Sequence, residues 1–204
     1  MDQRSALQID PTFREAIAYL DLTSIAVSRD VTFIVDKHLI LRAFNGAWTA
    51  FAMQNDGATI IDRFPLGAAI DAAFPVVLKD YFRSAYATAL RTHTPFELDY
   101  ECSSVDQLRH FHQSAYPLVD AAGLVIANHL IESRPHTQSV HAFTQRLIDA
   151  NGLITQCCNC RKLRDPEDET SWWWVPEAVA RTFPNTSHSI CPRCYDFYYP
   201  EIDL

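Results

Sequence analysis

The stretch VTFIVDKHLILRAF, residues 31–44, decides the fold of this chain. Two apolar segments rich in strand-forming residues, Val31–Val35 and Leu39–Phe44, flank the polar residues Asp36, Lys37 and His38. Such residues favour extended backbone, and a short polar interruption between two such segments is typical of a hairpin. The sequence therefore predicts two antiparallel strands, from which the rest of the domain can be traced in both directions.

Helical patterns lie on both sides of this hairpin. Upstream, an acid followed by proline at Asp10-Pro11 is a favourable helix start, and apolar residues at helical intervals predict an amphipathic helix over residues 11–20. Downstream, the same spacing predicts helices over residues 45–55 and 76–90. Three further strands are expected at residues 96–102, 108–119 and 124–131.

The order of two strands, helices and three strands resembles a PAS sensor domain over residues 31–132. The resemblance rests on Val31-Thr32-Phe33-Ile34-Val35-Asp36, on Asn45-Gly46-Ala47-Trp48, and on Arg109-His110-Phe111 leading to Tyr116-Pro117-Leu118. It implies an α+β fold: a five-stranded antiparallel sheet with inserted helices, which cups a small ligand or transmits a contact with a partner. The ligand is not identified by the resemblance.

Several residues are candidates for the wall of such a ligand pocket. The candidates are Trp48, Phe82, Tyr86, His110, Phe111 and His112. The aromatic members suit an apolar pocket or plain core equally well. His110 and His112 share one face of their strand by alternation, and an exposed or covered outer sheet face is the favoured alternative to a cavity. Haem is not indicated, because residues 76–90 contain no histidine and His93 lies just past them.

Two Cys-x-x-Cys pairs near the end of the sequence predict a metal site. Cys157 with Cys160, and Cys191 with Cys194, can each present two thiolates to one ion, and together they complete the tetrahedron of a structural Zn²⁺. Nearby Arg161, Lys162, Arg164 and Arg193 can offset the thiolate charge. A closed site of this kind leaves no position for catalysis. Redox-active disulfides are the main alternative.

Three other residues bear on this site. Cys158 could take the place of Cys157, although the Cys157 spacing fits the geometry of a zinc knuckle better. His188 could replace a cysteine as ligand, but with four cysteines present a supporting or packing role is favoured. Cys102 is expected to be a small buried residue elsewhere.

The end of the sequence resembles a zinc-ribbon-like module that follows sensor or receiver domains in some bacterial signalling proteins. The matching segments are residues 157–165, the tryptophans at 172–174 and residues 187–194, with Ser189 where that pattern usually has glycine. Core packing of the tryptophans is favoured over a partner-binding patch. Because consecutive residues cannot all point inward, at least one ring is expected to be partly exposed.

A helix is expected between the two modules. Val140, Phe143, Leu147, Ala150 and Ile154 recur at steps of three and four residues, which predicts a short coiled-coil-like seam over residues 139–152. Such a seam could pair two chains into a homodimer. A helix packed on its own sheet is an equally good interpretation.

Composition limits the classes of function. The chain has 204 residues and a formal net charge of −8, and residues 151–204 contain five Lys or Arg against eight Asp or Glu. This acidity argues against a nucleic-acid-binding finger, since phosphate neutralisation needs a basic surface. No secretory signal or bilayer-length apolar segment is visible, so a reducing cytoplasm is expected. Phosphate-binding glycine loops and the common hydrolase signatures are absent from the sequence.

The sequence thus predicts a non-enzymatic cytoplasmic signalling protein. The expected organisation is an N-terminal helical segment (1–30), a PAS-like domain (31–134), a connecting helix (135–152) and a zinc-binding module (153–204). The PAS-like domain would bind a small ligand and relay its state to a protein partner through the module. A zinc-dependent thiol redox switch and a zinc-ribbon transcription regulator are the competing interpretations.

Overall fold

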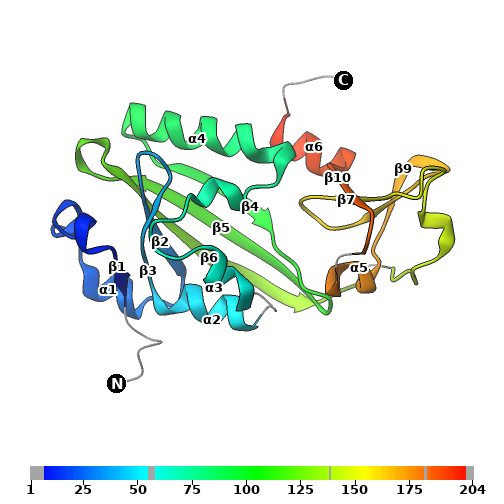
Figure 1. Ribbon diagram of the computed structural model, residues 1–204, viewed down its shortest axis with the longest axis horizontal. Helices are drawn as coiled ribbons and strands as arrows, with labels where there is room; N and C mark the ends of the chain where they lie inside the picture. The colour runs from blue at the N-terminus through cyan, green and yellow to red at the C-terminus, as the bar shows by residue number, and fades with distance from the viewer. Residues whose placement is uncertain (1–6, 55–57, 138, 182, 201–204) are drawn as a thin grey trace. The chain divides into compact units, whose positions relative to one another are not determined.

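The computed structural model describes residues 7–54, 58–137, 139–181 and 183–200 (Figure 1). The chain forms two compact units that are interleaved in sequence. The first comprises Met1–Phe74, Lys79–Tyr100 and Phe111–Ile131, and the second comprises Pro75–Leu78, Glu101–His110 and Glu132–Leu204. Each unit is described by itself below.

An antiparallel sheet of six strands organises the first unit. Its order is β1-β3-β2-β6-β5-β4, and the strands are β1 (Gln8–Ile9), β2 (Val31–Asp36), β3 (Leu41–Phe44), β4 (Phe96–Glu101), β5 (Gln107–Pro117) and β6 (Gly123–Pro135). The predicted hairpin is confirmed, since β2 and β3 pair antiparallel with Phe33 opposite Phe44. The expectation of five strands was wrong by one: β1 adds an edge strand that pairs Ile9 with Ala43. Two residues are too few to give a strand signal in the sequence.

The helices predicted after the second strand are present. They are α2 (Gly46–Gln54) and α4 (Lys79–Thr92). Between them lie helix α3 (Ala58–Arg63), which the sequence did not predict, and the short 3₁₀ turns η4 (Ile70–Ala73) and η5 (Val76–Leu78). Helix α4 is amphipathic, and its buried side chains are Tyr86 and Ala89. The insertion of these helices between β3 and β4 confirms the predicted α+β class.

The N-terminal segment differs from the predicted helix over residues 11–20. It forms two 3₁₀ turns, η2 (Pro11–Phe13) and η3 (Glu15–Ile17), followed by α1 (Leu22–Val27). Asp10 caps η2 through the Thr12 N–H, while Asp21 caps α1 through the Ser24 N–H. The second cap starts a new helix where the predicted one should end. Apolar residues three apart can pack equally well from 3₁₀ turns, so the periodicity did not identify the helix type.

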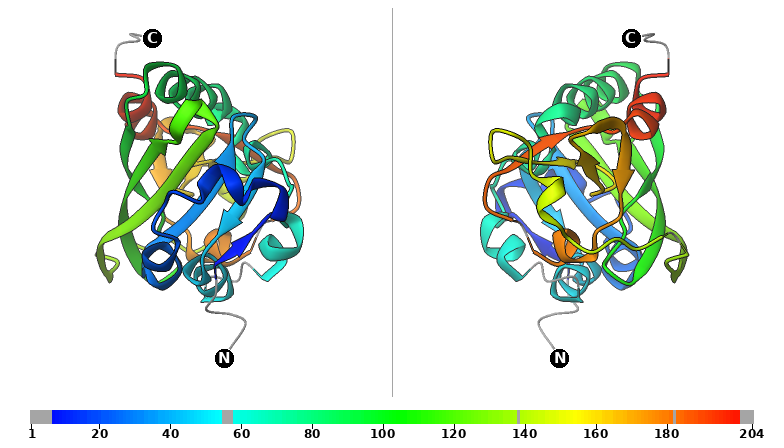
Figure 2. Two further views of the ribbon diagram at one scale, coloured as in Figure 1. Left: turned by 90° about the vertical axis from the view of Figure 1, so that its left-hand side faces the viewer. Right: turned by 90° about the vertical axis from the view of Figure 1, so that its right-hand side faces the viewer.

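Alternation along the strands gives the sheet two buried faces. On one face, Phe33 and Val35 of β2 join a core with Tyr86 and Ala89 of α4. On the other, Ile34 packs with Ile17; the N-terminal segment, dark blue in Figure 2, lies against the strands there. Helices and N-terminal segment therefore cover opposite faces of the same strands.

Asp36 fastens the hairpin to the N-terminal segment. Its carboxylate accepts hydrogen bonds from the His38 and Ile40 N–H groups and from Arg42, whose guanidinium also binds Asp10 at 2.6 Å. Burial opposes ionisation of Asp36, but the bonds from Arg42 and the two N–H groups outweigh it and hold the pKa of the carboxyl below its ordinary value. The network fixes the register of β1 beside β3.

A small mixed sheet organises the second unit. Its order is β10-β7-β8-β9, with β7 (Ile154–Cys157), β8 (Leu163–Asp165), β9 (Asp168–Trp173) and β10 (Thr186–Ser189), accompanied by α5 (Pro176–Ala180) and α6 (Pro192–Tyr198). Strand β10 pairs parallel with β7, whereas β8 pairs antiparallel with both β7 and β9. The core contains Leu147, Ile154, Leu163, Val175 and Ala178. Trp174 is buried, and Trp172 and Trp173 are partly exposed, as the sequence predicted.

In the described part of residues 135–152, which omits residue 138, the predicted connecting helix is absent, and so is the coiled-coil seam. Strand β6 continues to Pro135, and the helical conformation described in this stretch is the single 3₁₀ turn η7 (Gln145–Leu147). Asp149 then forms a turn by accepting hydrogen bonds from the Asn151 and Leu153 N–H groups, and Gly152 has φ +76°. Asp, Asn and Gly favour turns and interrupt helices. The regularly spaced apolar residues therefore lie on both sides of a turn and not along one helix.

Three apolar residues of the expected seam, Phe143, Leu147 and Ile154, pack within the second unit instead, whereas Val140 and Ala150 are exposed. Leu147 and Ile154 are buried in its core, and the Phe143 ring stacks on Phe183 with centroids 4.3 Å apart. Val140 forms an isolated parallel bridge with Trp174. No helix among the residues that the structure describes is long and apolar enough to span a bilayer.

Candidate metal centre

Four buried cysteines converge in the second unit. They are Cys157, Cys160, Cys191 and Cys194, and their sulfur atoms all lie within 4.8 Å of one another. The Cys160 and Cys191 sulfurs are 3.7 Å apart. Four sulfurs bound at the usual zinc distance in a tetrahedron stand roughly 3.8 Å apart. The cluster predicted from the two Cys-x-x-Cys pairs therefore has the size of a tetrahedral zinc-thiolate site.

The first pair lies on the turn between β7 and β8. The Cys157 N–H donates to the Lys162 carbonyl at 2.8 Å, and the Arg161 N–H donates to the Cys157 carbonyl at 3.1 Å. Arg161 has φ +64°, in the left-handed region. This tight turn returns the chain after four residues and leaves both sulfurs on the same side.

The second pair lies at the start of α6. Cys191 occupies the N-cap position, Pro192 follows in the first turn, and Cys194 is one turn along the helix. The parallel pairing of β10 with β7 sets Ser189 opposite Cys157, which brings the end of β10 to the first pair. The cluster is thus assembled by the sheet and does not depend on a flexible loop.

Hydrogen-bond donors support negative sulfur at the cluster. The Cys191 N–H points to the Cys157 sulfur at 3.4 Å, and the Asn159 amide points to the Cys194 sulfur at 3.3 Å. Hydrogen bonds from the Cys160, Cys191 and Cys194 thiols and from the Cys191 N–H lower the pKa of Cys157 despite its burial. Thiolate is the form that binds zinc, and such N–H donors tune it. All six cysteines are free thiols.

Neither Cys158 nor His188 belongs to the cluster. The Cys158 N–H donates to the Ser189 carbonyl, and burial, with the neighbouring Cys157, raises the pKa of its thiol to about 11. The alternative register through Cys158 is therefore not the one that the structure adopts. His188 lies exposed on β10 opposite Gln156. Cys102 is partly buried and is not one of the four clustered cysteines, and burial raises the pKa of its thiol.

The four basic residues expected near the cluster divide into two groups. The Arg161 guanidinium donates to the Val179 carbonyl at 2.6 Å, and Arg164 pairs with Glu169 at 3.4 Å. Lys162 and Arg193 instead line a cavity together with Cys160, Cys191 and Cys194. These two cations are placed to offset thiolate charge.

The predicted ligand-pocket residues do not share one cavity. Trp48, Phe82 and Tyr86 pack with the core on the helix-covered face of the sheet, and buried Phe111 stacks on Tyr100. His112 points to the other face, where it contacts Asp99 at 2.6 Å. His110 contacts Glu132 at 3.1 Å and lines the cavity of the second unit. Strand alternation separates the histidines from Phe111.

A buried polar network that sequence reasoning missed lies within the first unit. The Tyr86 hydroxyl donates to the Gln113 side chain at 2.7 Å, and Gln113 donates to Asn128 at 2.9 Å. The Tyr100 hydroxyl also donates to Asn128 at 2.9 Å. Burial raises the pKa of Tyr86 beyond its ordinary value. Gln and Asn at inward positions of apolar strands were the available signal, because buried amides need hydrogen-bond partners.

Comparison with known proteins gives little further identification. No protein-family model matches the chain. The chain is 30% identical over 116 residues to an uncharacterized 104.1 kDa protein in the hypE 3′ region of Rhodobacter capsulatus. The match covers 52% of this chain and 12% of that protein, so about half of the chain is similar to a small part of this much longer relative.

Proposed function

We propose that this chain is a non-enzymatic sensory or adaptor protein whose C-terminal module is stabilised by a structural zinc ion. The observation that carries the proposal is the closed, buried cluster of four cysteine sulfurs. Four protein ligands fill the tetrahedron of Zn²⁺, which leaves no position for a substrate or an activated water. The metal would then act as a staple for a surface that binds another molecule.

The PAS-like interpretation of the first unit is supported by the order of its elements. Two strands, inserted helices and three strands follow one another as the resemblance requires, and β1 is an addition at the edge. The Trp48 indole N–H is buried and has no hydrogen-bond partner within the described residues. A buried donor of this kind favours a polar ligand or a water near it. In this proposal the PAS-like domain detects a small molecule or a partner.

The signal route proposed from the sequence must change, because the connecting helix is absent. Strand β6 contributes Gly123–Ile131 to the first unit and its last residues to the second. After the strand, the His136 ring lies on Trp174 with centroids 4.4 Å apart. In this proposal, a displacement of β6 in the first unit reaches the core of the zinc module through the continuous strand. The strand transmits a signal only if a ligand or partner binds two arrangements of it unequally.

Native mass spectrometry of the full chain, expressed in rich medium, tests this proposal. We expect one zinc per chain, and any co-purified small molecule would appear as extra mass. Homodimerisation, also a proposal, is read from the same spectrum. A protein that contains no metal and carries a disulfide between the two cysteine pairs would contradict the zinc module.

A thiol redox switch is the second candidate, and Cys158 is the observation that favours it. Its free thiol is next to the cluster residue Cys157. Hydrogen peroxide would oxidise a cluster sulfur to sulfenic acid and leave as water, and condensation of the sulfenic acid with the Cys158 thiol would expel a second water, form a disulfide and release the metal. Zinc release under mild peroxide, measured with a chromogenic chelator in the wild type and in Cys158→Ser, separates the switch from a plain staple. Equal, slow release from both proteins excludes the switch.

A further inference from the structure

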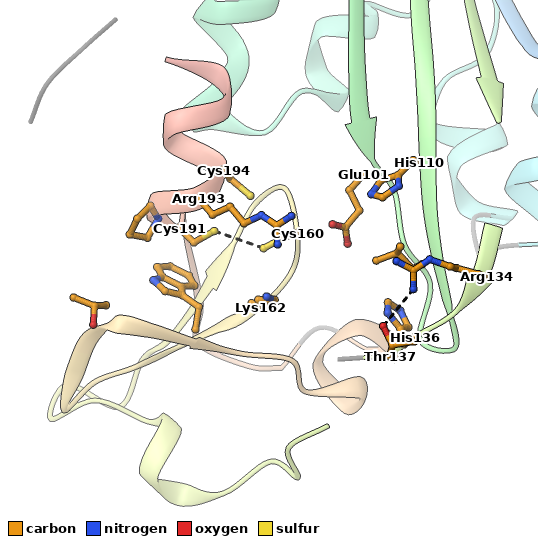
Figure 3. A pocket seen from close by; sticks show the side chains of 14 residues that line it. Glu101, His110, Arg134, His136, Thr137, Cys160, Lys162, Cys191, Arg193 and Cys194 are labelled. Atoms are coloured by element: carbon orange, nitrogen blue, oxygen red, sulfur yellow. Dashed lines mark hydrogen bonds between the residues drawn. The ribbon is translucent and has the colours of Figure 1, made fainter. Parts of the chain in front are cut away.

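A cavity of about 520 Å³ lies in the second unit, beside the cysteine cluster. Figure 3 shows side chains from the ends of the long strands on one side and from the cysteine-bearing elements on the other. Arg134, His110 and His136 come from the first group, and Lys162 and Arg193 come from the second. The volume is that of a pocket for a small organic ligand, for which about 300–1,000 Å³ is usual.

Local contacts hold one wall of this cavity in place. The Arg134 Nε donates to Glu132 at 2.7 Å, and one of its terminal nitrogens donates to the Thr137 hydroxyl at 3.3 Å. These two bonds fix the orientation of the guanidinium group. The His136 ring nitrogen Nε2 is 2.9 Å from the Ser104 carbonyl. Since His136 also packs on buried Trp174, this wall is anchored to the core of the same unit.

Cationic and N–H-bearing side chains outnumber carboxylates around the cavity. Lys162 and Arg193 form no ion pair with any residue that the structure describes, and their side chains provide eight N–H donors between them. The indole N–H of Trp172, another residue of the wall, is buried without a hydrogen-bond partner in the described ranges. Glu101 is the single carboxylate of the lining, and Ser103 already donates to it.

The negative charge of a zinc–thiolate cluster does not use up the N–H donors that line the cavity. A zinc ion with four thiolates carries about two negative charges, which Lys162 and Arg193 offset. Their N–H groups nevertheless remain available, and Arg134 stands on the opposite wall (Figure 3). Binding would then come from directed hydrogen bonds, since the net positive field is small.

We propose that this cavity binds a small organic oxyanion, in which a phosphate or carboxylate group accepts hydrogen bonds from Arg134, Lys162 and Arg193. Guanidinium groups match both kinds of oxyanion, because their paired N–H donors fit two oxygens at once. A ligand here contacts residues beside both cysteine pairs and the end of β6, so its binding stabilises the metal module against opening.

Isothermal titration calorimetry of the zinc-loaded full chain tests this site. The probes are glucose 6-phosphate, inorganic phosphate and succinate, which separate phosphate esters, free phosphate and carboxylates. We expect at least one probe to bind with a dissociation constant below about 1 mM at low ionic strength, and its affinity to fall as salt is added. No binding by any probe up to about 10 mM would overturn the proposal.

Three variants show whether binding occurs in this cavity. Arg134→Gln is the decisive change, because Arg134 is remote in sequence from every cysteine of the cluster, and it should weaken binding about tenfold or more. Arg193→Gln should do the same with zinc content measured in parallel. Arg91→Gln removes an exposed charge at the end of α4 and should leave the affinity unchanged. Equal affinity in Arg134→Gln and the wild type, or equal loss in Arg91→Gln, would also overturn the proposal.

Discussion

Cys157 and Cys158 are neighbours in the chain, but only the sulfur of Cys157 belongs to the cluster. Cys157 ends β7, whereas the Cys158 N–H continues the hydrogen bonding toward β10. Cys158 is the first residue of the turn that follows β7, so the end of the strand presents the Cys157 sulfur to the cluster and the turn leaves the Cys158 sulfur outside it. The local backbone makes the selection between two chemically identical side chains.

Serine substitutions test this selection. Cys157→Ser should abolish stoichiometric zinc binding, because a hydroxyl is a poor zinc ligand and three thiolates remain. Structural zinc contributes about 10–16 kcal/mol in small zinc modules, so the module should also lose its fold. Zinc content by elemental analysis, and protease sensitivity of residues 153–200, give the two readouts.

Cys158→Ser is the matched control for that substitution. The variant should retain one zinc per chain and the protease resistance of the wild type, because the Cys158 sulfur that it removes is outside the cluster. Full zinc in Cys157→Ser together with zinc loss in Cys158→Ser would show that the opposite register is correct.

The metal ligands could be predicted from the sequence because two Cys-x-x-Cys pairs are a spacing typical of structural zinc sites. The polar network of Tyr86, Gln113 and Asn128 could not be predicted in the same way. Each of these residues also occurs on exposed surfaces, and their contact joins positions 27 and 15 residues apart. The register of β5 beside β6, together with the packing of α4 on the sheet, brings them together.

At the level of elements, the close approach of β6 to β2 depends on Gly123. A Cβ atom at this position would lie 2.0 Å from the Val35 carbonyl oxygen and 2.8 Å from the Asp36 Cα. These are backbone atoms, which cannot move aside as a flexible side chain does. The pairing of Gly123 with Asp36 at the start of β6 therefore requires a residue without a side chain.

Gly123→Ala should lower the free energy of unfolding by about 1–3 kcal/mol, because the strands must separate to admit the methyl group. Chemical denaturation followed by circular dichroism measures the change. Ala121→Gly is the matched control in the same turn: Ala121 has φ +52°, where glycine is not strained, so stability should stay equal or rise by up to about 1 kcal/mol. Destabilisation of equal size in both variants would contradict this account.

The sequence predicted strands better than it predicted helices in this chain. The hairpin at residues 31–44 has a polar turn at its centre, so its two strands and their partnership followed from local signals. The expected helix over 139–152 rested on apolar spacing alone. Phe143 and Leu147 pack with Phe183 and Leu163, and the Val140 backbone bridges to Trp174, all of which come later in the sequence. Apolar residues spaced three or four apart can thus be set by contacts with distant parts of the chain, without a helix.

At the level of the whole molecule, the two units depend on different sources of stability. The first has two apolar clusters on opposite faces of a six-stranded sheet. The second has short strands of three to six residues around one small cluster and the four cysteines. Small cores of this size usually need a metal or disulfides to stay folded.

Chelation should therefore separate the two units. After a strong zinc chelator is added, amide hydrogen exchange in β7, β8 and β10 should accelerate by at least about a hundredfold, because the metal no longer closes the module. The amides of β2, β3 and the first half of β6 should retain their protection. Loss of protection in both groups of strands would show that the chain unfolds as one unit, and unchanged exchange in β7 would show that the metal is not structural.

The order in which the ribosome makes the chain has a consequence for the cysteine cluster. Its first two sulfurs are synthesised early in the module, and about thirty residues, including β8, β9 and α5, follow before Cys191. Until β10 has emerged and aligned with β7, the nascent chain holds only half a binding site. A translational pause or a proteolytic cut within this interval would leave an exposed dithiol, open to oxidation or to the wrong metal, although every residue of the first unit had already been made.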